Sequence, residues 1–177
     1  MTYIPDHWWT VRLFPEEVKW IERNGDKRNE NSEAINWKTK ATRTSDDDNI
    51  EGFAGEFAVS LVTGISIKQI VGKTKKELND GDLGSMIEVK TRKGSDENGW
   101  DLAVNEDQLK RDRVYFLALS YQWPTNILVV GWEWGKKIES EGIRRSYGVN
   151  GHPFFVLSYK KLKRVSSFFD VIEEIKK

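Results

Sequence analysis

The sequence predicts an α+β protein (α/β in the broad sense) with a central mixed β-sheet flanked by helices. Start and stop signals of a helix bound residues 15–25, and apolar residues recur at helical spacing in residues 50–64. From residue 65 the pattern changes to alternation and to continuous apolar runs, and a helical pattern returns at 166–177. Helices, then mostly strands, then a helix suggest one mixed sheet with helices packed on it.

The first helix is expected in "PEEVKWIERNG". Pro15 suits the first helical turn, two Glu follow it, and Gly25 is a natural end. The polar stretch that follows could hold another helical piece at 30–37. Residues 45–49 are expected to form a loop.

The second helix is expected in "IEGFAGEFAVSLVTG". Phe53, Phe57 and Leu61 recur every four residues and predict one apolar stripe, and Gly64 is a natural stop. Glu56 falls away from the centre of that stripe. Small residues around it would let another element come close: Gly52, Gly55 and Ser60.

The strands are expected after residue 65. "SMIEVKTR" alternates, which places Glu88, Lys90 and Arg92 on one face and Ile87, Val89 and Thr91 on the other. Residues 114–120 and 126–134 are continuous apolar runs typical of buried central strands. Weaker patterns predict strands at 65–71, 100–104 and 154–158, a helical turn at 105–111, a glycine-rich basic loop at 142–153 and an amphipathic helix at 166–177.

Composition limits the classes of function. The 177 residues carry 28 Lys or Arg and 28 Asp or Glu, so the formal net charge is zero, which argues against an indiscriminate polycation. No Cys is present, which excludes disulfides and thiolate metal sites and fits a reducing compartment. We expect no membrane span and no signal peptide, and a cytoplasmic location.

The stretch "GDLGSMIEVKTRKG" holds the strongest chemical signal. Glu88 and Lys90 leave the same strand face, and flanking glycines permit a bend that brings Asp82 beside Glu88. Two converging carboxylates can hold a hard divalent cation, and a neighbouring lysine can orient an attacking water. The plainer alternative is a solvated strand face with a same-strand charge pair.

The order of these motifs resembles the PD-(D/E)XK nuclease superfamily, which has a restriction-endonuclease-like core. The matching pieces are "GFAGEFA", "GDLG", "EVKTR" and "VVGWEWGKKI", and the resemblance covers about residues 50–135. Within the superfamily the chain looks most like a set of phage and prokaryotic proteins of poorly defined role. The family's core is a helix, three strands, a second helix and a further strand. Here no Pro precedes Asp82, a departure that is common in the family.

The resemblance implies Mg2+-dependent hydrolysis of DNA phosphodiesters, with Mn2+ as a substitute ion. Asp82, Glu88 and the Val89 carbonyl would hold the metal, Glu56 would complete its shell through water, and Lys90 would position the nucleophilic water. Glu51 is an alternative to Glu56, although at a helix start it more simply stabilises the helix dipole. The implied organisation is one nuclease-like domain over 1–177, with a helical extension at 1–49, a core at 50–135 and a C-terminal strand and helix at 136–177.

Basic and aromatic residues supply candidate DNA contacts. Arg92 shares the strand face of the site and is the best phosphate contact. The other candidates are Lys93, Arg28, Arg144 and Arg145. Gln108 is a candidate because some exonuclease branches of the superfamily place a Gln on the helix after the lysine strand. Exposed Trp residues could stack on bases, with candidates Trp8, Trp9 and Trp100.

Three functions stay open from the sequence. The first is a DNA nuclease in a prokaryotic or phage-infected cell, acting as a homodimer if it makes double-strand breaks. The second is a catalytically silent nuclease-fold domain that binds nucleic acid or a partner protein. The third is a structural or regulatory domain with no nucleic-acid role.

Overall fold

Four α-helices and two β-sheets form the part of the chain that the structure describes, and they confirm the predicted α+β class. The computed structural model describes residues 4–36, 46–67, 82–84, 86–94, 100–146 and 152–175. The helices are α1 (Pro15–Asn36), α2 (Asp46–Thr63), α3 (Gly135–Glu141) and α4 (Ile172–Ile175). The strand predicted at 65–71 falls mostly outside the described residues.

The first sheet has four strands in the order β1-β5-β4-β2: β1 (Trp9–Arg12), β5 (Asn126–Trp134), β4 (Val114–Gln122) and β2 (Ile87–Lys93). The β2–β4 pair is parallel, whereas β4–β5 and β1–β5 are antiparallel, so this sheet is mixed as predicted. The two continuous apolar runs form its inner strands, β4 and β5. Both are buried over most of their length, which confirms that part of the prediction.

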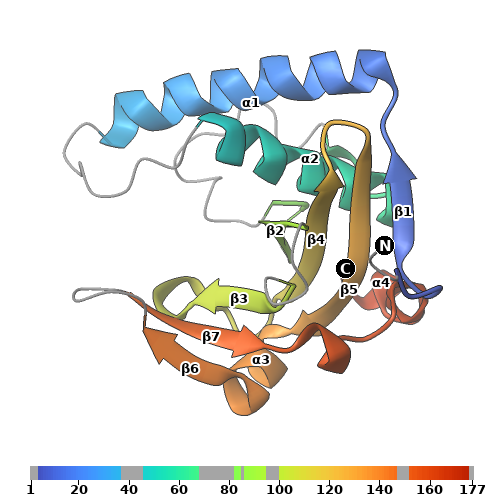
Figure 1. Cartoon of the computed structure of the whole chain (residues 1–177). Helices are drawn as coiled ribbons and strands as arrows, with labels where there is room; N and C mark the ends of the chain where they lie inside the picture. The colour runs from blue at the N-terminus through green and yellow to red at the C-terminus, as the bar shows by residue number, and fades with distance from the viewer. Residues whose placement is uncertain are drawn as a thin grey trace.

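Helix α2 covers one face of the first sheet, and α1 lies across α2 on the side away from the sheet (Figure 1). Phe116 and Ala118 of β4 point into the hydrophobic core under α2. Leu117 and Leu119 alternate with them and point into a second core on the opposite face. The site-bearing strand β2 therefore lies in a sheet with cores on both faces.

A second, three-stranded sheet contributes to that opposite core. Its antiparallel order is β3-β7-β6, with β3 at Leu102–Asn105, β6 at Ile143–Ser146 and β7 at Pro153–Leu157. Strand β6 corrects the loop predicted at 142–153, because Arg144 and Arg145 pair with Phe155 and Phe154 of β7. Hydrogen bonds to β7 hold this segment in an extended conformation. The glycines around it had favoured the prediction of a loop.

Helix α1 does not end at Gly25, as the sequence predicted, but continues to Asn36. Gly25 serves a close approach between helices. A Cβ at this position would lie 3.0 Å from Cγ1 and 3.2 Å from Cα of Ile50 in α2. Trp20 adds to the same contact, since its ring stacks on Phe53 at 5.6 Å. Tertiary packing therefore explains a glycine that resembled a helix stop.

Helix α2 begins at Asp46, so the predicted loop at 45–49 is wrong for most of its length. The buried face is also shifted from the predicted stripe: Leu61 is 51% exposed, whereas Ser60 and Glu56 are buried. Gly64 ends the helix with φ of 70°, as predicted.

Both ends of the chain differ from the prediction. Strand β1 was not predicted, and it pairs with β5 at the edge of the first sheet opposite β2. The helix predicted at 166–177 is a 3-10 helix, η6 (Val165–Asp170), followed by the single turn of α4. Phe168 and Ile172 are nevertheless buried on its inner side, as the amphipathic pattern indicated.

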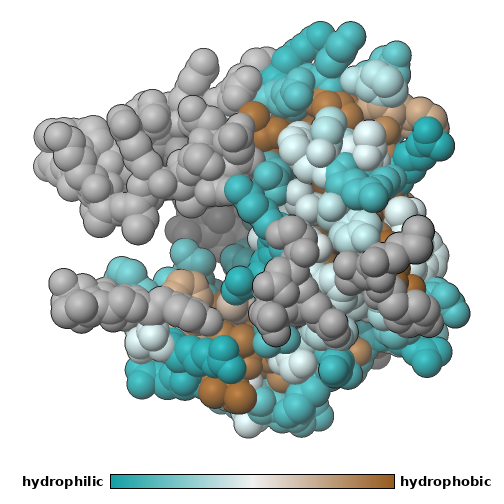
Figure 2. Space-filling view, viewed as in Figure 1, coloured by the Kyte–Doolittle hydropathy of each residue, from teal (hydrophilic) through white to brown (hydrophobic). Residues whose placement is uncertain are grey.

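The described surface is mostly polar on the face shown in Figure 2, where hydrophobic residues form only small separate patches. None of the helices in the described ranges is long and apolar enough to cross a membrane.

Candidate functional site

Strand β2 presents the predicted site residues. Ile87 and Val89 are buried toward α2, while Glu88, Lys90 and Arg92 are half-buried on the other face, as the alternation predicted. Glu88 lies beside Tyr115 in the parallel register with β4. Because Tyr115 belongs to the second core, the Glu88–Lys90–Arg92 face of β2 is the face that the second sheet covers.

Asp82 folds back onto the same strand. Gly84 has φ of 60°, a left-handed conformation that glycine adopts without strain, and it permits the tight bend between Asp82 and β2. The backbone N–H groups of Asp82 and Leu83 donate to the Ile87 carbonyl at 2.8 and 3.1 Å. The Val89 N–H then donates a hydrogen bond to Oδ2 of the Asp82 carboxylate, with 2.7 Å between the nitrogen and the oxygen.

This hydrogen bond fixes where Asp82 lies. In a strand, the N–H and C=O of one residue point to the same side, so the Val89 carbonyl faces the same edge as Asp82. That edge is the one away from β4. The structure therefore places Asp82 beside Val89, at the edge that the Val89 carbonyl also faces.

Glu88 stands among opposing charges. Its Oε2 lies 3.7 Å from Nζ of Lys90, and its Oε1 lies 2.5 Å from Nη1 of Arg113. Burial raises the pKa of Glu88 above 4.5, and the negative charge of Asp82 raises it further, while Lys90 and Arg113 act in the opposite direction. Charges of both signs therefore act on Glu88, and burial is the largest of the effects on its pKa.

Arg113 is the site residue that the sequence reasoning missed. In the sequence, Arg113 follows Lys110 and Arg111, and such a basic cluster is typical of a solvated surface. The parallel pairing of β2 with β4 brings the start of β4 beside Glu88, since Val114 is the register partner of Ile87. Side-chain exposures of 13% for Arg113 and 16% for Glu88 make this a largely buried ion pair. A prediction that β2 and β4 run parallel would have pointed to it.

Tyr115 continues the polar row on this face. Its hydroxyl accepts the Lys110 N–H at 2.8 Å and donates to the Gln108 carbonyl at 3.2 Å. Burial, above all, raises the pKa of Tyr115 to about 12, and the charge of Glu88 adds to the effect. Tyr115 is therefore neutral, and its two hydrogen bonds hold the turn that precedes Arg113.

Glu56 approaches β2 from the other layer. It is 4% exposed on α2, next to Gly55, whose missing side chain lets the helix lie against Thr91 of β2. The Thr91 hydroxyl donates to the Gly52 carbonyl at 3.2 Å across the same contact. Thr91 and Glu88 belong to opposite faces of β2. A group that contacts both Glu56 and Glu88 would therefore have to lie at the edge of β2, beside Asp82.

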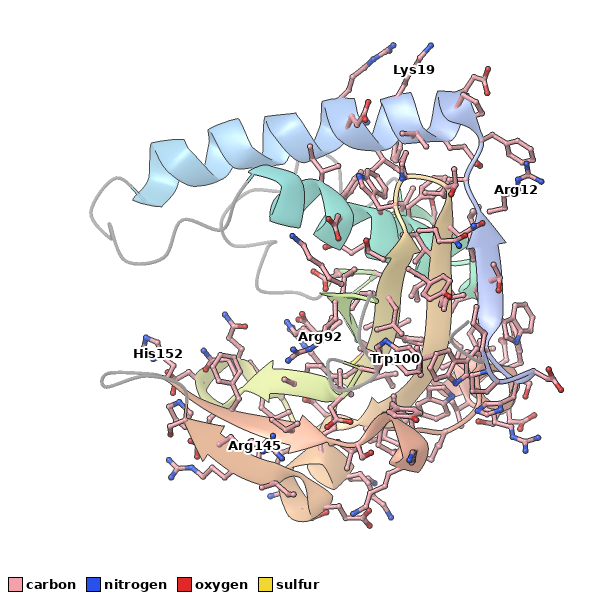
Figure 3. All side chains as sticks on the ribbon, in the orientation of Figure 1. Arg12, Lys19, Arg92, Trp100, Arg145 and His152 are labelled. Atoms are coloured by element: carbon pink, nitrogen blue, oxygen red, sulfur yellow. The ribbon has the colours of Figure 1, made fainter. Side chains whose placement is uncertain are left out.

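The predicted DNA contacts lie in different places. Arg92 projects from β2 into the space between α2 and β3, next to the candidate site, whereas Arg145 lies farther away on β6 (Figure 3). Lys93 is 4.0 Å from Oε1 of Glu51 on α2, which gives Glu51 an ion-pairing role. Arg144 is held by Glu106 at 2.9 Å. Arg28 lies in the part of α1 whose side chains the structure does not describe.

Two further candidates are not brought into the site. Gln108 ends the 3-10 helix η4 (Glu106–Gln108), with its side chain exposed and its carbonyl bound to Tyr115. Among the tryptophans proposed for base stacking, Trp8 and Trp100 are buried against each other at 5.1 Å. Trp9 is the one of the three that is exposed, at 41%.

The donor set fits a hard divalent cation in kind. Two carboxylates and one backbone carbonyl supply only oxygen atoms, the ligands that Mg2+ prefers. Each carboxylate oxygen has two lone pairs, so an oxygen of Asp82 that accepts one hydrogen bond can also bind a metal. Within the described ranges no three His, Cys, Asp or Glu side chains form a cluster, so the centre as described is a two-carboxylate one.

The chain was compared with known proteins. No family model matches it, and neither a curated protein nor a solved structure does.

Proposed function

We propose that the chain is a metal-dependent DNA nuclease of the PD-(D/E)XK type, with its centre at Asp82, Glu88, Val89 and Lys90. The observation that carries the proposal is the 2.7 Å hydrogen bond from the Val89 N–H to Asp82. It connects two acidic segments through the backbone of the residue between Glu88 and Lys90. A solvated strand face with a same-strand charge pair would not need Asp82 to fold back onto it.

The residues have distinct roles in this proposal. Asp82, Glu88 and the Val89 carbonyl would hold Mg2+ or Mn2+, and Glu56 would reach the shell through water. The bound ion would polarise the scissile phosphate and lower the pKa of a water. Lys90, 3.7 Å from Glu88, would orient that water and offset charge on the phosphate. Arg92 would contact a neighbouring phosphate, because it shares their strand face.

The test is cleavage of plasmid, linear and branched DNA with Mg2+ or Mn2+. We expect Asp82→Asn and Lys90→Ala each to reduce the rate by about 100-fold or more. Asp82→Asn keeps an acceptor for Val89 but loses the charge, so it separates chemistry from folding. Lys137→Ala is the matched control, since Lys137 pairs with Glu141 on the surface of α3 at 2.8 Å. A wild-type protein that cuts none of these substrates, or variants that cut as well as it does, would overturn the enzymatic proposal.

A second function is favoured by the Glu88–Arg113 ion pair. If Arg113 keeps its hold on Glu88, the fold would bind DNA or a protein partner without cutting. This alternative predicts DNA binding that survives both EDTA and Asp82→Ala. Binding that disappears under both treatments would exclude it.

The setting of the proposed nuclease is also part of the proposal. The substrate is DNA, and the enzyme would act in the cytoplasm of a prokaryotic or phage-infected cell. A homodimer would supply two active sites for a double-strand break. Light scattering of the protein with and without duplex DNA would measure the assembly.

A further inference from the structure

A pocket lies at the edge of the first sheet opposite β2, away from the candidate metal centre. It has a volume of about 610 Å3 and is lined by Pro5, Asp6, His7, Trp9, Arg164 and Ser166. The segment before β1 forms one side, and the chain entering η6 forms the other. Figure 1 shows these two segments side by side at the lower end of β1. The pocket is open to solvent rather than enclosed, so a ligand would lie along the surface in it.

Aromatic surface is the first feature of this pocket. Trp9 lies on the edge strand β1, is 41% exposed, and has its ring 6.1 Å from that of Phe169. Phe169 is itself 43% exposed. Large aromatic rings are usually buried when they serve only the core, as Trp8 and Trp100 are in this protein. The free ring surface of Trp9 is suited to stacking against another flat group.

Positive charge is the second feature. Arg164 lines the pocket, and it ends the basic stretch "KKLKR" at residues 160–164. Tyr159, on η5 (Tyr159–Lys161), packs edge-on against Trp8 at 5.6 Å, which ties this stretch to the segment that holds Trp9. Lys160 lies 5.6 Å from the centre of the Tyr159 ring and is exposed. Lys163 is held by the buried Glu133 at 3.1 Å, so Arg164 is the cation that the pocket lining itself supplies.

The remaining polar groups fit a nucleobase. Ser166 offers a hydroxyl and His7 a ring nitrogen. Asp6 is the acidic group in the lining, and it would oppose a phosphate but can accept a hydrogen bond from an N–H on a base edge. The base would therefore sit at Asp6 and Trp9, with a phosphate at Arg164.

We propose that this pocket is a binding site for single-stranded nucleic acid, with Trp9 as the stacking platform and Arg164 as the phosphate contact. An aromatic platform beside a cationic track is the recurring arrangement for single strands, because every base has a flat face and every nucleotide a phosphate. The site does not depend on the metal centre, from which the strands β5 and β4 separate it in the sheet.

The test is fluorescence anisotropy of a labelled oligo(dT) of about 12 nucleotides, a length suited to one such site. EDTA is present, so that cleavage cannot interfere. We expect Trp9→Ala to weaken binding by about tenfold or more and Trp9→Phe to retain most of it. Arg164→Ala should weaken binding and reduce the slope of log affinity against log salt by about 0.7, the value for one phosphate contact on a single strand.

Matched controls come from exposed residues outside the pocket. Phe14→Ala removes a ring that is 60% exposed, and Arg111→Ala removes an arginine paired with Glu139 on the surface at 3.1 Å. Both should bind as the wild type does. Circular dichroism melting checks that Trp9→Ala folds. If it does not fold, two variants still test the proposal: Trp9→Phe, which keeps an aromatic ring and should keep most of the binding, and Arg164→Ala, which should reduce the salt slope.

Two outcomes would overturn the site. One is a wild-type protein that does not bind the oligonucleotide. The other is Trp9→Ala and Arg164→Ala variants that bind as tightly as Phe14→Ala and Arg111→Ala. Asp82→Asn distinguishes this proposal from the nuclease proposal: binding should survive it, and its loss would place the strand at the metal centre instead. Conversely, a protein that binds through Trp9 but never cuts DNA would retain this site and lose the nuclease.

Discussion

The guanidinium of Arg113, the residue directly before β4, lies 2.5 Å from the carboxylate of Glu88 on β2, although the whole of β3 and η4 separates the two residues in the chain. The pair occupies one oxygen of a carboxylate that the proposed metal would need. Under the proposed function, Arg113 and a divalent cation would therefore compete for Glu88.

Removing Arg113 should strengthen metal binding. Loss of one positive charge at this range is worth about 1 to 4 kcal/mol in a half-buried site, so Arg113→Met should bind Mn2+ about tenfold more tightly or better. Titration of free Mn2+ by electron paramagnetic resonance measures this without DNA. Arg113→Lys keeps the charge and Arg111→Met removes a surface arginine, so both should resemble the wild type. If the wild type and the three variants bind Mn2+ with equal affinity, Arg113 does not compete with the metal for Glu88.

The acid–base behaviour of Glu88 gives a second prediction. Burial and Asp82 raise its pKa above 4.5, so the folded state holds the Glu88 proton more tightly than the unfolded chain. Glu88 therefore favours folding at pH values below 4.5, and this contribution is lost as the pH rises through the raised pKa. Asp82→Asn should lower the pKa of Glu88, and Arg113→Met should raise it.

Carbon-13 NMR of the Glu88 carboxyl group measures these shifts directly. Metal binding should weaken as the pH falls through the same pKa, since a protonated carboxyl group is a poor ligand. A Glu88 that titrates at or below 4.5 would contradict the proposed environment.

Two glycines on α2 give a matched pair for stability. A Cβ at Gly55 would collide with the Thr91 hydroxyl and lie 3.1 Å from Cβ of Ala118, whereas a Cβ at Gly52 would meet no atom within 4 Å. Gly55→Ala should lower the free energy of unfolding by about 1 to 3 kcal/mol through overpacking. Gly52→Ala should raise it by up to about 1 kcal/mol through helix propensity. Urea denaturation measures both, and similar effects would mean that α2 does not press against β2.

Much of the site could be predicted from local pattern. Alternation placed Glu88 and Lys90 on one face, and the glycines before β2 indicated a bend toward Glu88, which in the structure brings Asp82 to the Val89 N–H. Arg113 could not be predicted in the same way, because its contact depends on the parallel register of β2 with β4 and not on any spacing along the chain. Pairing between strands that are distant in the chain produces no periodic pattern of residues from which it could be predicted.

The fold, like the site, has elements that local sequence patterns predict and elements that they do not. The apolar runs of β4 and β5 identified central strands, because strands buried on both faces need no polar residues. Strand β1 was missed since it is short and mostly exposed, and β6 since all four of its residues are exposed. Gly25 resembled a helix end because sequence alone does not distinguish a glycine needed for φ from one needed for close packing.

Strand β1 also has a consequence for how the chain is made. Its pairs join Trp9 to Val129 and Arg12 to Asn126, so its partner is synthesised only after more than 100 further residues. During synthesis the nascent β1 has no β5 to pair with, and loop closure over such a length is slow relative to local hairpins such as β4–β5. We therefore expect the β4–β5 hairpin to assemble first and β1 to dock late, leaving Trp9 and its neighbours accessible to chaperones in the meantime.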